Sequence, residues 1–433
     1  MISKMLERDQ RYKQKQLQKI VLYAVSKSPL YREKYKFRDL SSDFEDKFRQ
    51  LPLLEREDYY KGMKSPSFTL PVNSLQNSFI FTSGGTTGDV KLTAWSPEFV
   101  ENWVDECYRS LVAVGLEAGD TVINLFFPGI WATHTLINKS LEKANCRIIP
   151  LGGKLSLELL VAYIKRFKVT ALIGVPSFIV RLTEYIDTMP ESERSGVQIK
   201  KIFHAGEFLS ESQADFIRER LDCDISPFLY SSTDTGTIGM KCEYSGTNQY
   251  HLADTMYLET LDLDTGEPVS AEISGEFVVT SLVNEKAPCI RYRVGDMGII
   301  HDTQCKCGNK APLFTLVGRA DDEVKVAGYL VSPAIIQQGL ENFPEISRNF
   351  QLIVQEVGKK AKLTVACETV PSVSSVPPDL TGRIADSLVK NYDILGVLIN
   401  QGYCLPLDIE ILKSGEIPRN PRTGKIKRVI DRR

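Results

Sequence analysis

The 433-residue sequence lacks any long uninterrupted hydrophobic run. Its most apolar longer stretch, residues 121–138, is broken by Pro128, Gly129 and His134 and falls short of the roughly 20 apolar residues that span a bilayer. The N-terminal residues MISKMLERDQRYKQKQLQK are charged throughout and lack the apolar core of a secretory signal. We therefore expect no membrane segment and a cytoplasmic protein.

The chain also lacks an excess of charge of either sign and a dense set of cysteines. A net charge of −2 provides no general attraction to nucleic acid or to an acidic membrane. Nine cysteines in a chain of this length do not suggest a disulfide framework. We expect six of them, which are well spread, to be reduced and buried: Cys107, Cys146, Cys223, Cys289, Cys367 and Cys404. Internal repeats and low-complexity segments are absent from the sequence.

A chain of this length exceeds what one hydrophobic core normally supports, so more than one domain is expected. Between about 98 and 220, amphipathic helical patterns alternate with short apolar runs such as DTVINLF, VTALIGV, IKKIFHAG and DISPFLY. Alternation of this kind predicts an α/β fold with parallel sheets covered by helices. Residues 250–316 instead form short β-rich pieces, and an α+β unit follows a boundary at about 318–323. We expect two domains, 1–317 and 318–433.

The most informative single stretch is TSGGTTGDVK, residues 82–91, which combines three glycines, four hydroxyl side chains and Lys91. Successive backbone N–H groups in a glycine-rich turn can hold a phosphate, and hydroxyl groups add donors. The spacing does not match G-x-x-x-x-G-K-S/T, so a P-loop NTPase is the weaker interpretation. Taken alone, an ordinary turn and an anion-binding loop remain equally open.

Four further motifs follow in order: YSSTDTG (230–236), IRYRVGD (290–296), VGRADDEVKVAG (317–328) and PRNPRTGKIKR (418–428). With the loop, they resemble the adenylate-forming superfamily of acyl-CoA synthetases and adenylation domains. The start LYREKYKF…LPLLERED, the run GVPSFIVRL, HAGEFLS and CKCG before VGRADD are similar to the phenylacetate–CoA ligase branch. The resemblance covers essentially the whole chain. It implies a large α/β domain with a small β-rich subdomain, which binds acid and ATP, and a small mobile C-terminal lid.

The resemblance also implies the roles of individual residues, which agree with the charge repulsion that a carboxylate and a triphosphate must overcome. Thr86, Thr87, Gly88 and Lys91 would hold the β- and γ-phosphates. Thr233 would contact the α-phosphate and Asp234 would bind Mg²⁺. Asp296 would accept both ribose hydroxyls, assisted by Arg319. The remaining cofactor-binding residues implied are Gly206, Glu207, Tyr230, Ser231, Ser232, Lys325 and Gly328.

Lys425 would bridge the carboxylate and the α-phosphate as charge develops in the transition state. On composition alone, RNPRTGKIKRVIDRR is a solvated basic tail, but the Gly424–Lys425 pair matches the fifth motif of the series. The sequence departs from the family pattern at Ser231, where glycine is usual, and at Asp234, where glutamate is usual. The shorter Asp234 side chain weakens its assignment to Mg²⁺.

Cys305 and Cys307 form a C-x-C pair, and Cys242 and His251 lie 63 and 54 residues upstream of Cys305. Three thiolates and an imidazole are a common structural zinc set. From the spacing alone, zinc and ordinary loop cysteines both remain open. Similar positions in the phenylacetate–CoA ligase branch favour a zinc that ties two β-rich loops together.

Two histidines are candidates for the acyl pocket. His134 fits an ordinary hydrogen-bonded histidine equally well. His204 precedes Ala205–Gly206–Glu207, which resembles the family's nucleotide- and acyl-facing segment, and is the better candidate.

The sequence therefore predicts an ATP-dependent ligase that makes an acyl-adenylate and then a thioester, most simply with CoA. Aromatic acids fit the family branch, and a homodimer is left open. One alternative keeps the adenylation and transfers the acyl group to a carrier-protein pantetheine or another acceptor. Another is a non-catalytic nucleotide- or zinc-binding scaffold, against which Lys91, Asp296 and Lys425 argue.

Overall fold

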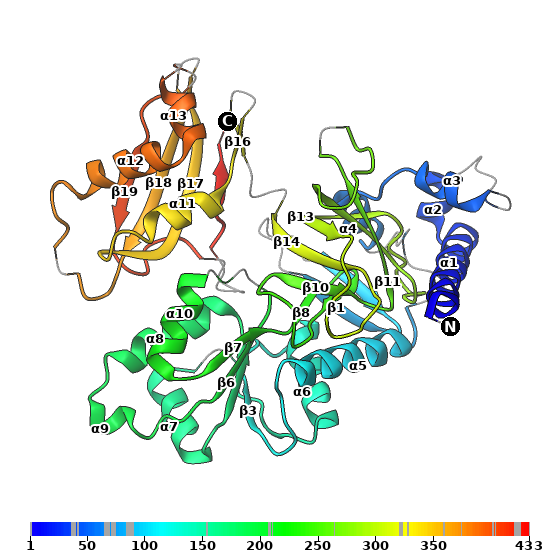
Figure 1. Cartoon of the computed structure of the whole chain (residues 1–433), viewed down its shortest axis with the longest axis horizontal. Helices are drawn as coiled ribbons and strands as arrows, with labels where there is room; N and C mark the ends of the chain where they lie inside the picture. Colours follow the sequence, from blue (N-terminus) through cyan, green and yellow to red (C-terminus); the bar gives the residue numbers. More distant parts are fainter. Residues whose placement is uncertain are drawn as a thin grey trace. The chain divides into compact units, whose positions relative to one another are not determined.

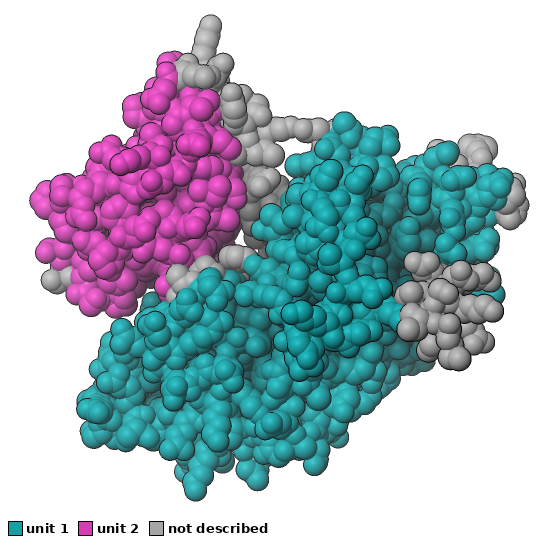
Figure 2. Space-filling model, in the orientation of Figure 1, with its two compact units in different colours: residues 1–317 teal, residues 318–433 magenta. Residues whose placement is uncertain are grey.

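The structure is a computed structural model that describes residues 2–35, 40, 43–64, 70, 75–83, 91–152, 155–206, 209, 211–263, 265–319, 324–326, 329–357, 360–373, 375–400, 402, 404–419 and 426–432. For residues 2–11, 83, 91, 177, 212, 319, 324–326, 329, 330 and 356 it describes the backbone alone. The chain forms two compact units, Met1–Val317 and Gly318–Arg433, which are coloured separately in Figure 2. Figure 1 shows the elements of each unit.

The first unit contains a five-stranded parallel sheet. In spatial order its strands are β4 (Arg147–Ile149), β3 (Thr121–Asn124), β5 (Ala171–Gly174), β6 (Lys201–His204) and β7 (Asp224–Pro227). Successive residues of a strand point to opposite faces. Val122 accordingly belongs to one hydrophobic cluster and Ile123 to another. Because both faces are covered, the central strand β5, with the sequence ALIG, is apolar throughout.

Helices cover the two faces of this sheet separately (Figure 1). The helices α5 (Pro97–Ala113) and α6 (Ala132–Lys143) supply one cluster, including Trp103 and Ile137. The other cluster contains residues of α7 (Leu157–Phe167), α8 (Pro176–Asp187) and α10 (Glu211–Leu221). The short α9 (Glu191–Arg194) buries no residue.

The first unit also contains a seven-stranded sheet. Its spatial order is β11 (Met256–Leu261), β12 (Ser274–Ser281), β13 (Tyr292–His301), β14 (Leu313–Arg319), β10 (Gln249–Leu252), β9 (Gly236–Met240) and β8 (Leu229–Ser232). In a flat sheet, β8 and β12 would lie about 24 Å apart, five spacings of about 4.8 Å. The ring centroids of Tyr230 on β8 and Phe277 on β12 are 6.4 Å apart, so the sheet is strongly curved.

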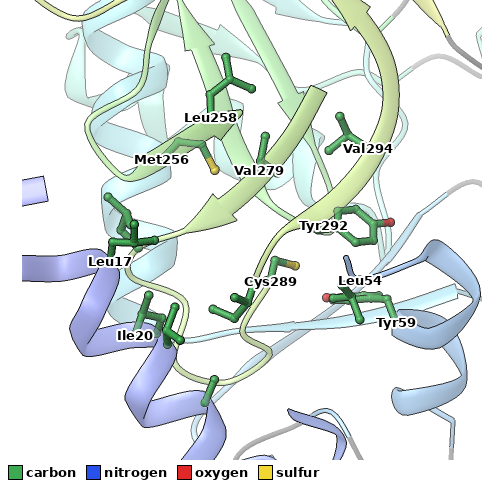
Figure 3. Close-up of a cluster of buried hydrophobic side chains, with 14 of the residues drawn as sticks. Leu17, Ile20, Leu54, Tyr59, Met256, Leu258, Val279, Cys289, Tyr292 and Val294 are labelled. Atoms are coloured by element: carbon green, nitrogen blue, oxygen red, sulfur yellow. The ribbon is translucent and has the colours of Figure 1, made fainter. Parts of the chain in front are cut away.

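The N-terminal helices pack against this curved sheet. They are α1 (Ile2–Lys27), α2 (Pro29–Lys34), α3 (Phe44–Arg49) and α4 (Arg56–Gly62), and the hairpin β1 (Phe79–Ser83) with β2 (Lys91–Trp95) follows them. Figure 3 shows Leu17 and Ile20 of α1 beside Met256 and Cys289 in one hydrophobic cluster. These contacts join residues that are more than 230 positions apart in the sequence.

The second unit is a four-stranded sheet with helices. Its spatial order is β19 (Asp408–Leu412), β18 (Lys360–Thr369), β17 (Ile346–Val357) and β20 (Val429–Asp431). The helices are α11 (Pro333–Leu340), α12 (Leu380–Asn391) and α13 (Asp393–Asn400), and β15 (Val324–Val326) pairs with β16 (Tyr329–Val331). The unit has a hydrophobic cluster of its own, including Ile336, Leu352 and Leu388.

The structure confirms the predicted α/β class, with a parallel sheet between helices and an α+β C-terminal unit. The run DISPFLY differs from the prediction because it contributes to two sheets, β7 and β8, which are separated at Phe228. Helix α6 was not predicted, since its sequence ATHTLINKSLEK follows Pro128 and Gly129 in what looked like a broken apolar stretch. Cys146 is only half-buried, whereas the other five spread cysteines are buried as expected. Among the described helices, none combines the length and apolar character needed to cross a bilayer.

Candidate functional site

The motif YSSTDTG forms the end of β8, a tight turn and the start of β9. The turn depends on Gly236, which has φ +85° and on which a Cβ would lie 2.4 Å from Cζ of Phe99. Two indole N–H groups hold it: Trp95 donates to the carbonyl of Thr233 at 2.9 Å, and Trp103 donates to Oγ of Ser231 at 3.2 Å. The predicted nucleotide-contacting residues thus lie on a rigid turn supported by β2 and α5.

Asp234 is buried below this turn, with 5% of its surface exposed. Its Oδ2 accepts hydrogen bonds from the hydroxyls of Tyr60 at 2.7 Å and Tyr292 at 2.8 Å. Burial, and then the nearby Asp234 carboxylate, raise the pKa of Tyr292 well above its ordinary value, so this phenol remains a donor. Oδ2 therefore faces two phenols rather than solvent, and the Mg²⁺ role of Asp234 stays a prediction.

Asp296 lies in an irregular part of β13. Three residues of β13, Val294 to Asp296, stand opposite the single Phe277 of β12, and Gly295 has φ +74°. Bulges of this type bend a strand and redirect a side chain. Oδ2 of Asp296 accepts a hydrogen bond of 2.5 Å from the hydroxyl of Tyr230. This contact joins the second and third of the predicted motifs.

The ring of Tyr230 is itself fixed by aromatic neighbours. Its centroid lies 6.0 Å from those of Tyr250 and Phe314 and 6.4 Å from that of Phe277. Aromatic pairs at these separations attract one another. The phenol is therefore held in place beside Asp296, whose side chain is half-buried.

Gly206 and His204 lie at the carboxyl end of β6, the edge at which parallel α/β sheets bind ligands. Gly206 is exposed and has φ +84°. His204 is 4% exposed, and both of its ring nitrogens lack a hydrogen-bond partner among the described residues. Burial and then the charge of Lys241 lower the pKa of His204 to about 3, so its imidazole is neutral. His134, in contrast, hydrogen-bonds through Nδ1 to the carbonyl of Phe126 at 2.7 Å and is an ordinary structural histidine.

Several predicted residues lie outside the described residues: Thr86, Thr87, Gly88, Glu207, Gly328 and Lys425. The backbone of Lys91 begins β2, that of Arg319 ends β14, and that of Lys325 lies in β15. Their side chains are not described. Ser232 is half-buried, and its Oγ accepts a hydrogen bond of 3.2 Å from the amide of Asp234.

The four predicted metal ligands come together. The ligand atoms of Cys242, His251, Cys305 and Cys307 all lie within 4.8 Å of one another. Sγ of Cys242 is 3.6 Å from Sγ of Cys305, and Sγ of Cys307 is 3.3 Å from Nε2 of His251. The loop at Cys242 and strand β10, which carries His251, therefore converge with the loop of Cys305 and Cys307, more than 50 residues later, on one set of N and S donors, the set that structural zinc prefers.

The surroundings of these ligands fit a cation. Nδ1 of His251 lies 3.3 Å from the carbonyl of Ala311, which directs Nε2 toward the cluster. Burial disfavours the thiolate of Cys242, but hydrogen bonds, led by Ser245, outweigh it and lower its pKa to about 6. Burial, together with the other two thiols, raises the pKa of Cys307 to about 11. A bound divalent cation would relieve the repulsion that keeps this thiol protonated.

Sequence reasoning missed residues that support these sites. Tyr60 is 174 positions from Asp234, and no local pattern connects them. Lys241, directly before Cys242, is 5% exposed and donates through Nζ to the carbonyls of Thr247 at 3.1 Å and Gln249 at 2.9 Å. It therefore holds the loop between Cys242 and His251. A lysine beside a cysteine ligand carries no sequence signal that separates this role from a solvated charge.

The chain matches two family models. Residues 5–282 match the model described as AMP-binding enzyme. Residues 328–433 match the model described as AMP-binding enzyme C-terminal domain.

Individual proteins of known sequence or structure are similar over nearly the whole chain. Phenylacetate-coenzyme A ligase of Escherichia coli is 23% identical over 418 residues, which cover 95% of this chain and 92% of the relative. Phenylacetate-coenzyme A ligase of Thermus thermophilus is 23% identical over 443 residues, covering 97% and 96%. A crystal structure of 2-hydroxyisobutyryl-CoA ligase in complex with R3-HIB-AMP is similar in fold, with a TM-score of 0.80 and 19% identity, covering 99% of this chain and 90% of that one.

Proposed function

The chain belongs to the AMP-binding enzyme family, and on that premise we propose that it is an ATP-dependent acid–thiol ligase. It would first join a carboxylic acid to AMP with release of pyrophosphate, and then transfer the acyl group to a thiol. The 1–317 unit would bind the acid and ATP, and the 318–433 unit would act as a mobile lid.

The observation that carries this proposal is the contact between Tyr230 and Asp296. A carboxylate that accepts one hydrogen bond from a fixed phenol is held in one orientation and keeps further lone pairs for other donors. Two vicinal ribose hydroxyls are donors of matching geometry. Asp296 would thus anchor the nucleoside, with the turn at Thr233 beside the α-phosphate.

Binding of the ATP triphosphate would require neutralisation of its negative charge. Thr86, Thr87, Gly88 and Lys91 would hold the β- and γ-phosphates, with Arg319 assisting at the ribose. Mg²⁺, with Asp234 as its candidate ligand, would neutralise charge on the phosphates. Lys425 would stabilise the charge that develops between the carboxylate and the α-phosphate.

Lys425→Ala tests the adenylation step. Losing one contact to transition-state charge costs on the order of 10²-fold or more in rate. We expect pyrophosphate release to fall by that factor while the thermal melting temperature is unchanged. Pyrophosphate release at the wild-type rate would remove Lys425 from the mechanism.

The acceptor is proposed to be CoA and the acid an aromatic one, as in the relatives named phenylacetate-coenzyme A ligase. His204 supports a partly polar acid pocket, because its buried neutral ring can hydrogen-bond a substituent of the acid. A screen of pyrophosphate release over aryl and aliphatic acids, with and without CoA, tests both points. Pyrophosphate exchange without CoA consumption would favour the alternative acceptor, a pantetheinyl carrier protein.

We further propose that Cys242, His251, Cys305 and Cys307 bind a structural zinc, which the close approach of their ligand atoms supports. This donor set needs reduced thiols, which accords with a cytoplasmic location. Purified protein should contain about one zinc per chain, and Cys305→Ser should lower both the zinc content and the melting temperature. Cys146→Ser is the matched control, because Cys146 is a half-buried thiol outside the cluster. Metal-free protein with unchanged melting would contradict the assignment.

A further inference from the structure

Glu368 in β18 is a fully buried carboxylate, with 0% of its surface exposed. Its Oε1 accepts a hydrogen bond of 2.8 Å from the amide of Ile417, and its Oε2 accepts one of 3.0 Å from the side chain of Asn349. The guanidinium of Arg419, which is largely exposed, lies 3.5 Å from Oε2. A buried ion pair is often no more stabilising than apolar residues of similar size, so a contribution to stability does not by itself explain Glu368.

All these contacts involve described residues on either side of positions 420–425. Arg419, directly before these positions, pairs with Ile426, directly after them, in an antiparallel bridge. The following residue is also held, because the buried side chain of Gln351 on β17 donates to the carbonyl of Lys427 at 3.0 Å. The described residues before and after positions 420–425 are therefore attached to the same sheet, Arg419 through Glu368 and Lys427 through β17.

We propose that Glu368 is a positioning residue for acyl-adenylate formation. By fixing Ile417 and Arg419, and Ile426 through its bridge to Arg419, it holds the described residues that flank positions 420–425, the range that contains Lys425. The inference rests on the proposed function, in which Lys425 acts in adenylation. A displacement of about 1 Å in a catalytic group can cost on the order of 10²-fold in rate. The proposed function assigns Lys425 to adenylation and not to transfer from acyl-AMP to the thiol, so we expect Glu368 to leave that transfer unchanged.

Glu368→Gln is the direct test. The glutamine keeps the size of the side chain and can still accept from the amide of Ile417. The NH₂ group of the glutamine, however, would face the donor groups of Asn349 and Arg419, and it cannot accept hydrogen bonds from them. The substitution also removes the negative charge that attracts Arg419. We expect pyrophosphate release to fall at least tenfold, whereas thioester formation from preformed acyl-AMP stays within twofold of wild type. In a Lys425→Ala background, Glu368→Gln should change the residual adenylation rate no further.

Asp408→Asn is the matched control, because Asp408 lies on the neighbouring strand β19, is exposed and pairs with Lys362 at 2.8 Å. It should change neither half-reaction. Arg419→Ala provides a second variant, since an exposed side chain can be removed without unfolding the unit. If Glu368→Gln does not fold, a severalfold loss of adenylation alone in Arg419→Ala supports the inference, and no loss refutes it.

Three results would overturn the inference. Wild-type adenylation in both Glu368→Gln and Arg419→Ala would refute it and leave the proposed function intact. Equal loss in both half-reactions would reduce Glu368 to a structural residue, with the same consequence. A wild-type chain that forms no acyl-adenylate from any acid would overturn the proposed function, and this inference with it.

Discussion

Glu106 offers a quantitative test of the structure through its effect on stability. This residue of α5 is 2% exposed, and its Oε1 accepts a hydrogen bond of 2.8 Å from the hydroxyl of Thr255. Burial raises the pKa of Glu106 from 4.5 to about 7, although the hydrogen bond from Thr255 opposes the shift. Glu106 therefore makes the stability of the first unit depend on pH near neutrality.

The sign follows from where each state releases its proton. The unfolded chain releases the Glu106 proton near pH 4.5, whereas the folded chain keeps it up to about pH 7. The contribution to stability is therefore complete below about pH 4.5 and is lost as the pH rises through about 7. A shift of this size corresponds to about 3 kcal/mol of unfolding free energy between pH 4.5 and pH 8. Glu106→Gln, which cannot ionise, should remove this loss and be more stable than wild type at pH 8.

Urea unfolding at pH 5 and pH 8, followed by tryptophan fluorescence, measures the effect. The three tryptophans, Trp95, Trp103 and Trp131, all belong to the first unit, so the signal reports on that unit. The control is Glu101→Gln on the same helix, whose wild-type side chain is 71% exposed. The difference in unfolding free energy between Glu106→Gln and wild type should grow by about 2 to 3 kcal/mol between pH 5 and pH 8. A difference that does not depend on pH would refute the burial of an ionisable Glu106.

Three further predictions follow from the contacts described above. Tyr230→Phe removes the hydrogen bond to Asp296 and should raise the KM for ATP roughly tenfold in a pyrophosphate-release assay, since a hydrogen bond to a charged group contributes about 1.5 kcal/mol or more; an unchanged KM would count against Asp296 as the ribose anchor. Arg291→Met removes the bidentate partner of Glu259, whose side chain is only 9% exposed, and should lower the unfolding free energy by about 3 to 5 kcal/mol in the fluorescence assay. A change below about 1 kcal/mol would contradict the low exposure of this ion pair. Asp321→Pro lies within the expected domain boundary at 318–323, which we expect to act as a hinge, and outside the described residues; it fixes φ near −65° and should impair one half-reaction far more than the other. Equal losses would make the residue merely structural.

Much of the fold was predictable because periodicity reports which faces of an element are buried. Alternating helices and short apolar runs predicted the parallel sheet, whose central strands are buried on both faces. Helix α6 was missed because Pro128 and Gly129 precede it closely and obscure its start. The curvature of the seven-stranded sheet was also beyond sequence reasoning. It involves contacts between strands distant in sequence order, such as that of Tyr230 with Phe277, which no local pattern predicts.

The residues of the candidate sites also divide into those that a sequence pattern predicts and those that only the fold brings together. The short spacing of Cys305 and Cys307 indicates a possible metal site in the sequence, and in the structure these residues lie beside Cys242 and His251. The partners of buried charges have no such spacing. Tyr60 reaches Asp234 across 174 residues and Thr255 reaches Glu106 across 149, so the fold alone brings each pair together. The prediction of Asp234 as a metal ligand rested on a motif that carries no information about these phenols.

The packing of the N-terminal helices against the curved sheet has a consequence for synthesis on the ribosome. Lys13 donates a hydrogen bond to the carbonyl of Ala253, 240 residues away. The hydroxyl of Tyr31 donates one to the carbonyl of Pro288, 257 residues away. At about 5 to 20 residues per second, the partners of Tyr31 are translated roughly 13 to 50 s after it. For most of that interval, until β8 begins at Leu229, none of the sheet that covers the apolar stripe containing Leu17 and Ile20 has been translated. The many charged residues of α1 would keep the waiting helix in solution, and any delay in translation before Pro288 would lengthen its exposure to chaperones and to aggregation.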